Sequence, residues 1–385
     1  MLVLRRAAMA SLGRRSLSTY LPRITERRAT EAGPGGRSSE AGVRVAIFGA
    51  SGFLGRYVCC RLGTNGVLAY MGNRGDEFEM RHLKPMFDLG RSKFVFYSPR
   101  DVDSMREVIG DADVVINMIG KYYETKAPVQ TEKFPYVGYE TNYSFADANV
   151  EIARTIAELC LEMQIDHLIH VSSAAASPDA ASEWARTKYE GEQAVKEVYP
   201  WATIVRPTQL FGPEDRFLNW FAKVASRFRM IPLVEAGDSL TQPVYMGNVA
   251  ETISRIVDDP AKFEGRYVDC FGPKDYTYAE LAQFVIDITG QEVSTMELPK
   301  EVIQFGARFL QYERSPLITP DLVDIWSEDY LPALTPEEYK KQKGVDKILT
   351  MEDLGIKSTP IEKAAFDYLH RFRKGGHFTI VSGYH

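Results

Sequence analysis

Hydrophobic residues in the first half of the chain form short runs that alternate with longer amphipathic stretches. The first run, Val43–Phe48, is rich in β-branched residues and stops at Gly49, which is typical of a buried strand. Further strands are expected at 67–71, 94–97, 114–119, 167–172 and 203–206, and helices at 54–62, 103–109, 143–163 and 183–198. Because strands that alternate with helices require crossover connections, the pattern predicts a doubly wound α/β fold with a parallel sheet.

This alternation breaks down after about Phe211. Shorter helical and extended pieces follow, interrupted by Pro232, Pro243, Pro273, Pro299, Pro316 and Pro320. We expect residues 43–211 to form the sheet domain. Residues 212–385 are expected to form a smaller cap and interaction domain, some of whose segments return to the sheet. Such a cap would cover the carboxyl ends of the strands, where doubly wound sheets bind their ligands.

Residues 1–42 have a different composition from the rest. Before Glu26, five arginines stand among Ala, Leu and Ser, and no acidic residue occurs. An amphipathic, arginine-rich and acid-poor segment of this kind is typical of a mitochondrial presequence, and the Gly-, Ser- and Pro-rich stretch 31–42 indicates a linker. The alternative is a basic tail without a targeting role.

The overall composition excludes several classes of protein. The formal net charge of −6 argues against a nucleic-acid partner, since general nucleic-acid binders are usually basic. No stretch approaches eighteen uncharged apolar residues, so no membrane-spanning helix is predicted. The four cysteines lack the paired spacing of a zinc site, so no metal site is predicted and free thiols are expected.

A glycine-rich turn lies at the junction of the first strand and helix. In Gly49-Ala50-Ser51-Gly52-Phe53-Leu54-Gly55 the first glycine permits a tight turn, the second lets the backbone approach a pyrophosphate, and the third allows close packing of helix on strand. Free N–H groups at the helix start then face the phosphates. The sequence predicts a dinucleotide-binding Rossmann domain, with cofactor contacts from Gly49, Ser51, Gly52, Phe53, Leu54 and Gly55.

The loop after the second strand indicates which nicotinamide dinucleotide binds. NAD-binding domains usually carry an acidic residue here, but this loop reads Gly72-Asn73-Arg74. The planar guanidinium of Arg74 suits a 2′-phosphate, so Asn73 and Arg74 are predicted to contact NADP(H). Asp76 and Glu77 lie close enough to reverse this assignment if the loop is shifted, and a solvated Arg74 is the other alternative.

Together with the turn, Val171-Ser172-Ser173 and Arg206-Pro207-Thr208 resemble the extended and atypical short-chain dehydrogenase/reductase superfamily. Its active members pair the serine with a Tyr-x-x-x-Lys helix, where the lysine charge favours the phenolate of the acid–base tyrosine. Here Lys188 is kept, but Trp184 occupies the tyrosine position, and an indole N–H cannot exchange a proton in this role. No catalytic residue is therefore predicted.

Further cofactor contacts are implied by this resemblance. Ser172 and Lys188 would contact the nicotinamide ribose, although Lys188 has the alternative of a solvated helix lysine. The other implied contacts are Met118, Ile119, Gly120, Pro207 and Leu210. Ser98 replaces the aspartate that active relatives usually place near the adenine, which puts that contact in doubt. Tyr122 and Tyr123 are the remaining candidates for a reactive hydroxyl.

Within the superfamily, the chain resembles the Rossmann-like accessory subunits of mitochondrial respiratory complex I. The matching segments are Val114–Gly120, Phe211–Asn219, Ile231–Leu233, Gln242–Tyr245 and Glu352–Ile356. The resemblance implies a tightly bound NADPH without turnover and a peripheral position on the matrix side of the inner membrane near the quinone site. It also implies contacts with other complex I subunits and with the membrane surface, for which Arg371, Arg373 and Lys374 are candidates, unless they are simply a solvated charge run.

Two other functions remain open at this stage. One is a free NADP-dependent reductase acting on a quinone-like or isoprenoid substrate. The other is an RNA-binding relative of the same fold, which the acidic charge balance disfavours.

Overall fold

The structure, a computed structural model, describes residues 42–124, 126–130, 137–313, 315–334, 336–342 and 348–373. The expected presequence and most of the linker lie outside these residues, as does Lys374.

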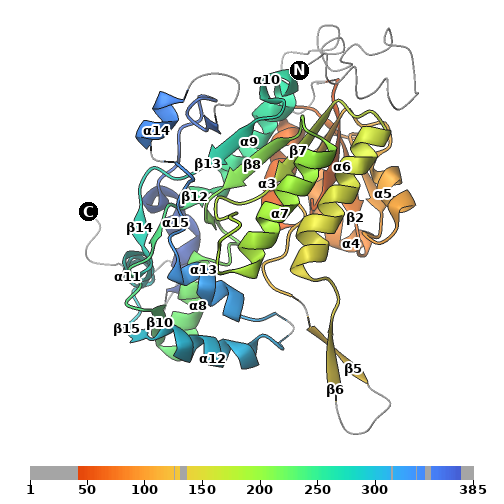
Figure 1. Cartoon of the computed structure of the whole chain (residues 1–385). Helices are drawn as coiled ribbons and strands as arrows, with labels where there is room; N and C mark the ends of the chain where they lie inside the picture. The colour runs from red at the N-terminus through yellow and green to blue at the C-terminus, as the bar shows by residue number, and fades with distance from the viewer. Residues whose placement is uncertain are drawn as a thin grey trace.

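Eight parallel strands form the central sheet (Figure 1). Their order is β16-β13-β8-β7-β4-β1-β2-β3, with β1 (Arg44–Phe48) between β2 (Leu68–Asn73) and β4 (Val114–Asn117). The others are β3 (Ser92–Phe96), β7 (His167–Val171), β8 (Thr203–Pro207), β13 (Tyr267–Cys270) and β16 (Leu349–Thr350). The predicted doubly wound parallel sheet is confirmed.

Helices cover both faces of this sheet (Figure 1). Because side chains alternate along a strand, Val45 and Ile47 face α3 (Phe53–Thr64) and α9 (Met246–Asp258). Ala46 and Phe48 belong to a second core with the helices of the opposite face. Those helices are α5 (Val102–Ile109), α6 (Ile152–Glu162) and α7 (Glu183–Val198).

The later part of the chain packs around a third core. Aromatic side chains dominate its centre, where the rings of Trp220 and Trp326 meet with centroids 4.5 Å apart. The helices are α8 (Leu218–Phe228), α11 (Tyr278–Thr289), α12 (Lys300–Leu310), α13 (Pro320–Ser327) and α15 (Ile361–Leu369). Paired strands β10 (Met230–Val234) and β15 (Ser294–Leu298) accompany them, whereas α9, β13 and β16 return to the sheet domain.

Short elements connect these parts. They are α4 (Glu77–Met80), η2 (Arg81–Met86), β9 (Leu210–Phe211), β11 (Leu240–Thr241), β12 (Val244–Tyr245), α10 (Pro260–Phe263), β14 (Tyr276–Thr277), α14 (Pro336–Lys341) and η4 (His370–Phe372). Among the described residues, no helix is long and apolar enough to cross a membrane.

Three local features differ from the sequence-based expectation. The strand expected at 114–119 ends at Asn117, because the Asn117 side chain accepts the N–H of Ile119 and turns the chain away. The helix expected at 143–163 begins later and opens with a π-helical turn, η3 (Asp147–Glu151). Between them, β5 (Lys126–Gln130) and β6 (Val137–Thr141) form an unpredicted antiparallel hairpin that extends away from the body (Figure 1).

Candidate nucleotide-binding site

The glycine-rich turn has the geometry expected of a phosphate-binding loop. Gly49 has φ +84°, and a Cβ there would lie 2.9 Å from the Met118 carbonyl oxygen. A Cβ on Gly55 would lie 2.3 Å from the Gly49 carbonyl oxygen, so only glycine allows α3 to start this close to β1. Gly52 is the N-cap of α3, with no side-chain cap and no acidic residue in the first turn. The first N–H groups of α3 therefore remain available to an anion.

The loop after β2 presents Arg74 to solvent at the carboxyl end of the sheet. Asn73 is buried, and its side chain donates to the carbonyls of Gly75 and Asp76 while accepting the Gly75 N–H. Asn73 therefore shapes the loop, and these bonds occupy the side-chain amide that the sequence assigned to the cofactor. Asp76 accepts the Phe78 N–H as the cap of α4.

Cations converge beside this loop. Lys121 donates to the Tyr143 carbonyl at 3.1 Å, and both Lys121 and Arg100 lie over the Tyr143 ring. Burial lowers the pKa of Lys121, and the neighbouring charge of Arg74 lowers it further. The ends of β2, β3 and β4 thus share a positive potential. The Ser98 hydroxyl accepts the Arg100 N–H at 3.4 Å.

Polar groups without partners gather at the ends of β4 and β7. Among the described residues, the Ser172 hydroxyl and the Asn149 side-chain oxygen are buried and accept or donate no hydrogen bond. Lys188 is buried beside them, with Nζ 3.5 Å from the Val171 carbonyl oxygen and 3.0 Å from where a Cβ on Gly120 would stand. Unpaired buried groups of this kind are satisfied when a polar ligand such as a ribose binds.

Burial also sets the ionisation of this cluster. It lowers the pKa of the Lys188 ammonium to about 8, an effect that the Glu192 carboxylate partly offsets. Burial lowers the pKa of His170 to about 3, with a further contribution from the Lys188 charge, so His170 is neutral at physiological pH. Asn149 belongs to the π-helical turn η3, and π-turns are frequent at functional sites.

Trp184 is buried at the start of α7, in the place of the missing tyrosine. The Tyr122 ring packs beside it with centroids 5.4 Å apart, and the Tyr122 hydroxyl bonds Gln209. The backbone N–H of Trp184 donates to Asp321 of α13. Residue 184 therefore lies where the sheet domain contacts the later part of the chain.

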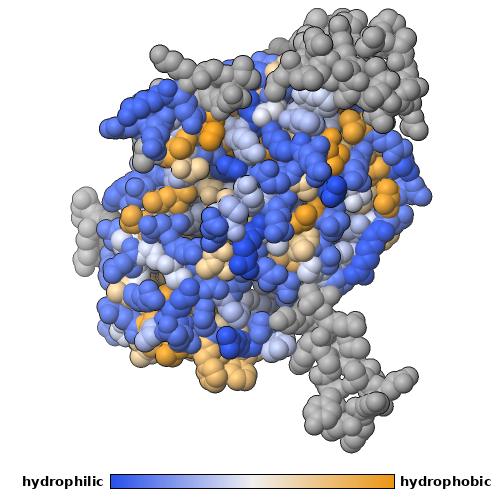
Figure 2. All heavy atoms as spheres, viewed as in Figure 1, coloured by the Kyte–Doolittle hydropathy of each residue, from blue (hydrophilic) through white to orange (hydrophobic). Residues whose placement is uncertain are grey.

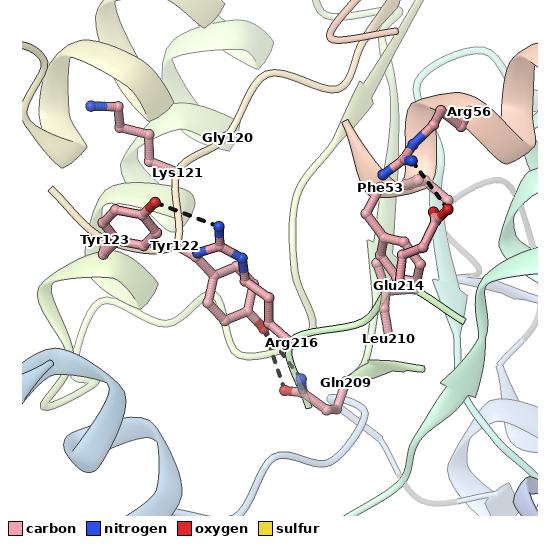
Figure 3. A pocket seen from close by; sticks show the side chains of 11 residues that line it. Phe53, Arg56, Gly120, Lys121, Tyr122, Tyr123, Gln209, Leu210, Glu214 and Arg216 are labelled. Carbon is pink, nitrogen blue, oxygen red and sulfur yellow. Dashed lines mark hydrogen bonds and ion pairs between the residues drawn. The ribbon is translucent and has the colours of Figure 1, made fainter. Parts of the chain in front are cut away.

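A cavity of about 580 Å³ lies between the phosphate-binding turn and the later part of the chain (Figure 3). Four of the predicted cofactor residues line it: Phe53, Leu54, Gly120 and Leu210. Seven further lining residues were not assigned to the cofactor from the sequence: Arg56, Lys121, Tyr122, Tyr123, Gln209, Glu214 and Arg216. Other predicted cofactor residues do not line this cavity. Met118 and Ile119 directly follow β4, and Pro207 is buried, with its carbonyl accepting the Ala174 N–H.

Two bridges cross the mouth of this cavity (Figure 3). Arg56 of α3 pairs with Glu214 at 3.1 Å, and Arg216 lies over the Tyr123 ring and donates to its hydroxyl at 3.5 Å. Burial alone would raise the pKa of Tyr123, but the hydrogen bond from Arg216, a hydrogen bond with Ser315 and nearby positive charge lower it overall.

The loop that carries Glu214 and Arg216 is held by a buried carboxylate. Asp215 accepts the N–H groups of Gly212, Phe217 and Asn219, together with the Tyr368 hydroxyl of α15 at 3.0 Å. Burial raises the pKa of Asp215 despite these donors. We call residues 212–219 the mouth loop.

The basic residues near the end of the described chain have internal partners. Arg371 donates to the Pro213 carbonyl and the Asn219 side chain, and Arg373 donates to the Ile288 carbonyl. These bonds hold residues 371–373 against α8 and α11. Among the described residues, no group of three or more His, Cys, Asp or Glu side chains is arranged to hold a metal ion.

Comparison with known proteins agrees with this site. The model of the NAD dependent epimerase/dehydratase family matches residues 45–269. The fold is similar to that of dTDP-glucose 4,6-dehydratase from Bacillus anthracis, solved with NAD (TM-score 0.58, 13% identity, 86% of this chain and 96% of that one). UDP-glucuronic acid 4-epimerase from Bacillus cereus, solved with UDP-glucuronic acid and NAD, gives a TM-score of 0.55 at 15% identity, covering 85% and 99%.

Relatives with similar sequences identify a narrower family. NADH dehydrogenase (ubiquinone) 1 alpha subcomplex subunit 9, mitochondrial, from Mus musculus is 36% identical over 89% of this chain and 83% of its own length. The protein of the same name from Arabidopsis thaliana is 34% identical, covering 89% and 81%. The chain belongs to the NAD dependent epimerase/dehydratase family and, within it, to the family of these mitochondrial alpha subcomplex subunits. The predicted cofactor class, a nicotinamide dinucleotide, agrees with the description of the larger family.

Proposed function

We propose that this chain is an accessory, non-catalytic subunit of mitochondrial respiratory complex I in which bound NADPH stabilises the fold and the assembly. One observation supports the proposed absence of catalysis. Buried Trp184 and the Tyr122 ring fill the place of the acid–base tyrosine, while the phosphate-binding turn is intact. A ligand that binds only the folded state stabilises it by about 4 kcal/mol at a thousand times its Kd.

The loop after β2 supports NADPH over NADH. Asp76 caps α4 and Glu77 pairs with Lys84 at 2.6 Å, so both carboxylates already have partners within this segment, whereas Arg74 faces solvent. Arg74 adds its charge to that of Lys121 at the same edge of the sheet. A 2′-phosphate would be attracted there, because a guanidinium offers it paired N–H donors.

The proposal places the subunit peripherally on the matrix side, near the quinone site and against the membrane surface. Helix α12 supplies an apolar face for that surface: Val302, Phe305 and Phe309 are 55%, 66% and 66% exposed and share one side of the helix. Hydrophobic side chains gather at the edge of the molecule over α12 (Figure 2). Amphipathic helices with exposed aromatic residues lie at the boundary of headgroups and acyl chains.

Native electrophoresis of mitochondria, followed by immunodetection of this chain, tests membership in the complex. The expected result is migration with a large membrane complex and with its other subunits. A chain found solely as a free monomer or dimer would contradict the proposal and support a soluble reductase.

That reductase, acting on a quinone-like or isoprenoid substrate, is the second candidate. It is favoured by the retained Ser172 and Lys188, and by the two tyrosine hydroxyls at the cavity. Steady oxidation of NADPH by the purified chain with such a substrate, abolished in Lys188→Ala, would establish it.

Flotation with liposomes tests the membrane face separately. Phe305→Ser with Phe309→Ser should reduce flotation with vesicles that contain cardiolipin, because it removes the two most exposed aromatic rings of α12. Phe78→Ser is the matched control, since Phe78 is 68% exposed but lies on α4 in the sheet domain. Equal flotation of both variants would contradict the assignment of α12.

A further inference from the structure

One edge of the central sheet is open. Strand β3 ends the strand order on one side, and among the described residues no strand pairs with its outer side. The Tyr97 N–H donates to the Asn73 carbonyl of β2, and the residues of a strand that bond to the same neighbour alternate. The N–H and carbonyl groups of Ser92, Phe94 and Phe96 therefore point away from the sheet.

The opposite edge of the sheet is protected by the chain itself. Strand β16 has only two residues, and the Asp353 side chain accepts both the N–H and the hydroxyl of Thr350 in it. Short strands and local turns of this kind keep a sheet from pairing with other chains. Strand β3 has five residues and no proline, so it is the edge to which another strand can add.

Exposed apolar side chains gather around this open edge. Among the described residues of the sheet domain, four of the five exposed large hydrophobic side chains belong to residues 78–102. They are Phe78, Leu89, Phe96 and Val102. Leu89 precedes β3, Phe96 ends it and Val102 begins α5, so the group runs along the outer strand. Apolar side chains grouped in this way mark a surface that another protein covers.

The same stretch is basic within an acidic chain. Residues 81–100 contain five lysines and arginines and one acidic residue, Asp88, whereas the whole chain has a net charge of −6. Lys93 of β3 lies over the Tyr70 ring and pairs with no carboxylate of the described residues. A second copy of this chain would place the same cations opposite one another, because a twofold interface is self-complementary. An acidic partner would instead be attracted.

We propose that β3 is a docking edge for an acidic, extended segment of a neighbouring subunit, which adds to the sheet as a further strand. Its backbone would pair with the outward groups of Phe94 and Phe96, and its carboxylates would lie near Lys93. The helices before and after β3, α4 and α5, lie on the flank of the molecule away from α12 (Figure 1), so this edge is separate from the proposed membrane face. The identity of the partner as a complex I subunit rests on the proposed function.

Hydrogen exchange in the native assembly tests this edge. The full chain is isolated from mitochondria with its partners in mild detergent, and its amides are compared with those of the purified chain alone. The amides of Phe94 and Phe96 should exchange about a hundredfold more slowly in the assembly, because a partner strand would bond them. The Val95 amide is the matched control. It faces β2 in both states, so its exchange should slow much less.

Variants separate backbone pairing from side-chain contact. Phe96→Pro removes the ring and the outward N–H but no bond to β2, whereas Phe96→Ser removes the ring alone. The fraction of chain that migrates with the large complex should be about tenfold lower for Phe96→Pro than for Phe96→Ser. Lys93→Glu should lower that fraction and Lys93→Arg should keep it. Equal urea midpoints of the purified variants would show that their folds are intact.

The outcomes distinguish this proposal from the proposed function. Equal exchange of the Phe94 and Phe96 amides in complex I and in the purified chain would overturn the docking edge and leave membership in complex I unaffected. Protection of these amides in a different assembly would contradict the role in complex I, and the docking edge would stand. Protection that appears in the purified chain together with dimer formation would assign the edge to a second copy and overturn the acidic partner.

Discussion

The two ends of the nucleotide cavity are built in different ways. At the phosphate end the proposed contacts would come from backbone N–H groups, which the turn leaves without a side-chain cap because Gly52 has no side chain. At the opposite end the ring of Trp184 and the ring of Tyr122 pack together beside the buried Lys188. One end remains free for a ligand, and the other is occupied by the chain itself.

On the proposed function, this difference implies that binding and chemistry can be lost independently. Recognition of the phosphates depends on a backbone path that several glycines fix jointly, whereas proton transfer depends on one hydroxyl at one helix position. On the proposed function, a single replacement at residue 184 would remove the second without changing the first. The lysine and serine that remain can still serve as ligands for a ribose.

The largest expected effect follows from a change at the phosphate end. Gly52→Val places a branched side chain where the pyrophosphate would approach, so the purified protein should contain no dinucleotide, as measured by chromatography of the acid extract. Assembly into the large complex should fall with it. Gly306→Val is the control, because a Cβ at Gly306 meets no atom within 4 Å, and its nucleotide content should equal that of wild type. Full occupancy in Gly52→Val would show that the phosphates bind elsewhere.

The next largest effect is a pH dependence of the free energy of unfolding, caused by Lys188 at the end where Trp184 and Tyr122 pack together. Because the pKa of Lys188 falls to about 8 in the fold, the folded chain holds fewer protons than the unfolded one between pH 8 and about 10. The contribution of Lys188 to stability therefore rises with pH across this window, by up to about 1.4 kcal/mol per unit.

Urea unfolding of the nucleotide-free protein measures this dependence by comparison with Lys188→Met. The variant should be the more stable below pH 8, by up to about 3 kcal/mol, and the gap should close as the pH rises. The difference isolates Lys188, because burial also lowers the pKa of Lys196 to about 8 in both proteins. A gap that stays constant from pH 7 to 9.5 would contradict a buried, titrating lysine.

A smaller effect concerns the choice of dinucleotide. Arg74→Ala should weaken NADPH by about 1.5 kcal/mol, the lower end for a charged hydrogen bond because Arg74 is exposed, and should change NADH little. Fluorescence titration of both cofactors measures the difference. Arg81→Ala, which removes an arginine that lies over the Phe78 ring nearby, is the control. Equal losses for both cofactors would mean that Arg74 does not contact the 2′-phosphate.

The smallest expected effect is the most specific test of the occupied end. Trp184→Tyr restores a Tyr-x-x-x-Lys pair, yet NADPH oxidation with carbonyl, quinone or sugar-nucleotide compounds should stay at the background rate, because Tyr122 still fills the adjacent space. The variant should assemble nearly normally, since one aromatic side chain replaces another. Turnover that appears with this single change would mean that a substrate pocket has survived intact.

Periodic and long elements were predictable from the sequence because their local signals agree. Helix α7 was predicted at 183–198 and has those bounds, with Ser182 accepting the Ala185 N–H as its cap. Strand β16 has only two residues, too few for any period to register, and it pairs with β13 from far along the chain. The hairpin of β5 and β6 was missed because Pro128 and Gly138 interrupt its strands.

The candidate site was predictable where chemistry is encoded locally. The turn Gly49–Gly55 and the pair Trp184 and Lys188 stand at fixed spacings that a sequence displays. The charged residues at the cavity mouth could not be predicted, because their partners are far away in the sequence. Arg216 contacts Tyr123, which lies 93 positions earlier, and Glu214 pairs with Arg56 of the sheet domain. Asn73 is predicted to contact the cofactor, and the hydrogen bonds of its side chain with the Gly75 backbone are a further role that no spacing reveals.

Tyr368 and Arg371 fix the mouth loop through hydrogen bonds, and this affects the order in which the chain can fold. The first residue along the chain that lines the cavity is Phe53, but the mouth loop is fixed by residues more than 300 positions later. A chain delivered amino terminus first can form the phosphate-binding turn early, yet its entrance stays unsecured until α15 has arrived. On the proposed function, a chain truncated before α15 should therefore release its nucleotide.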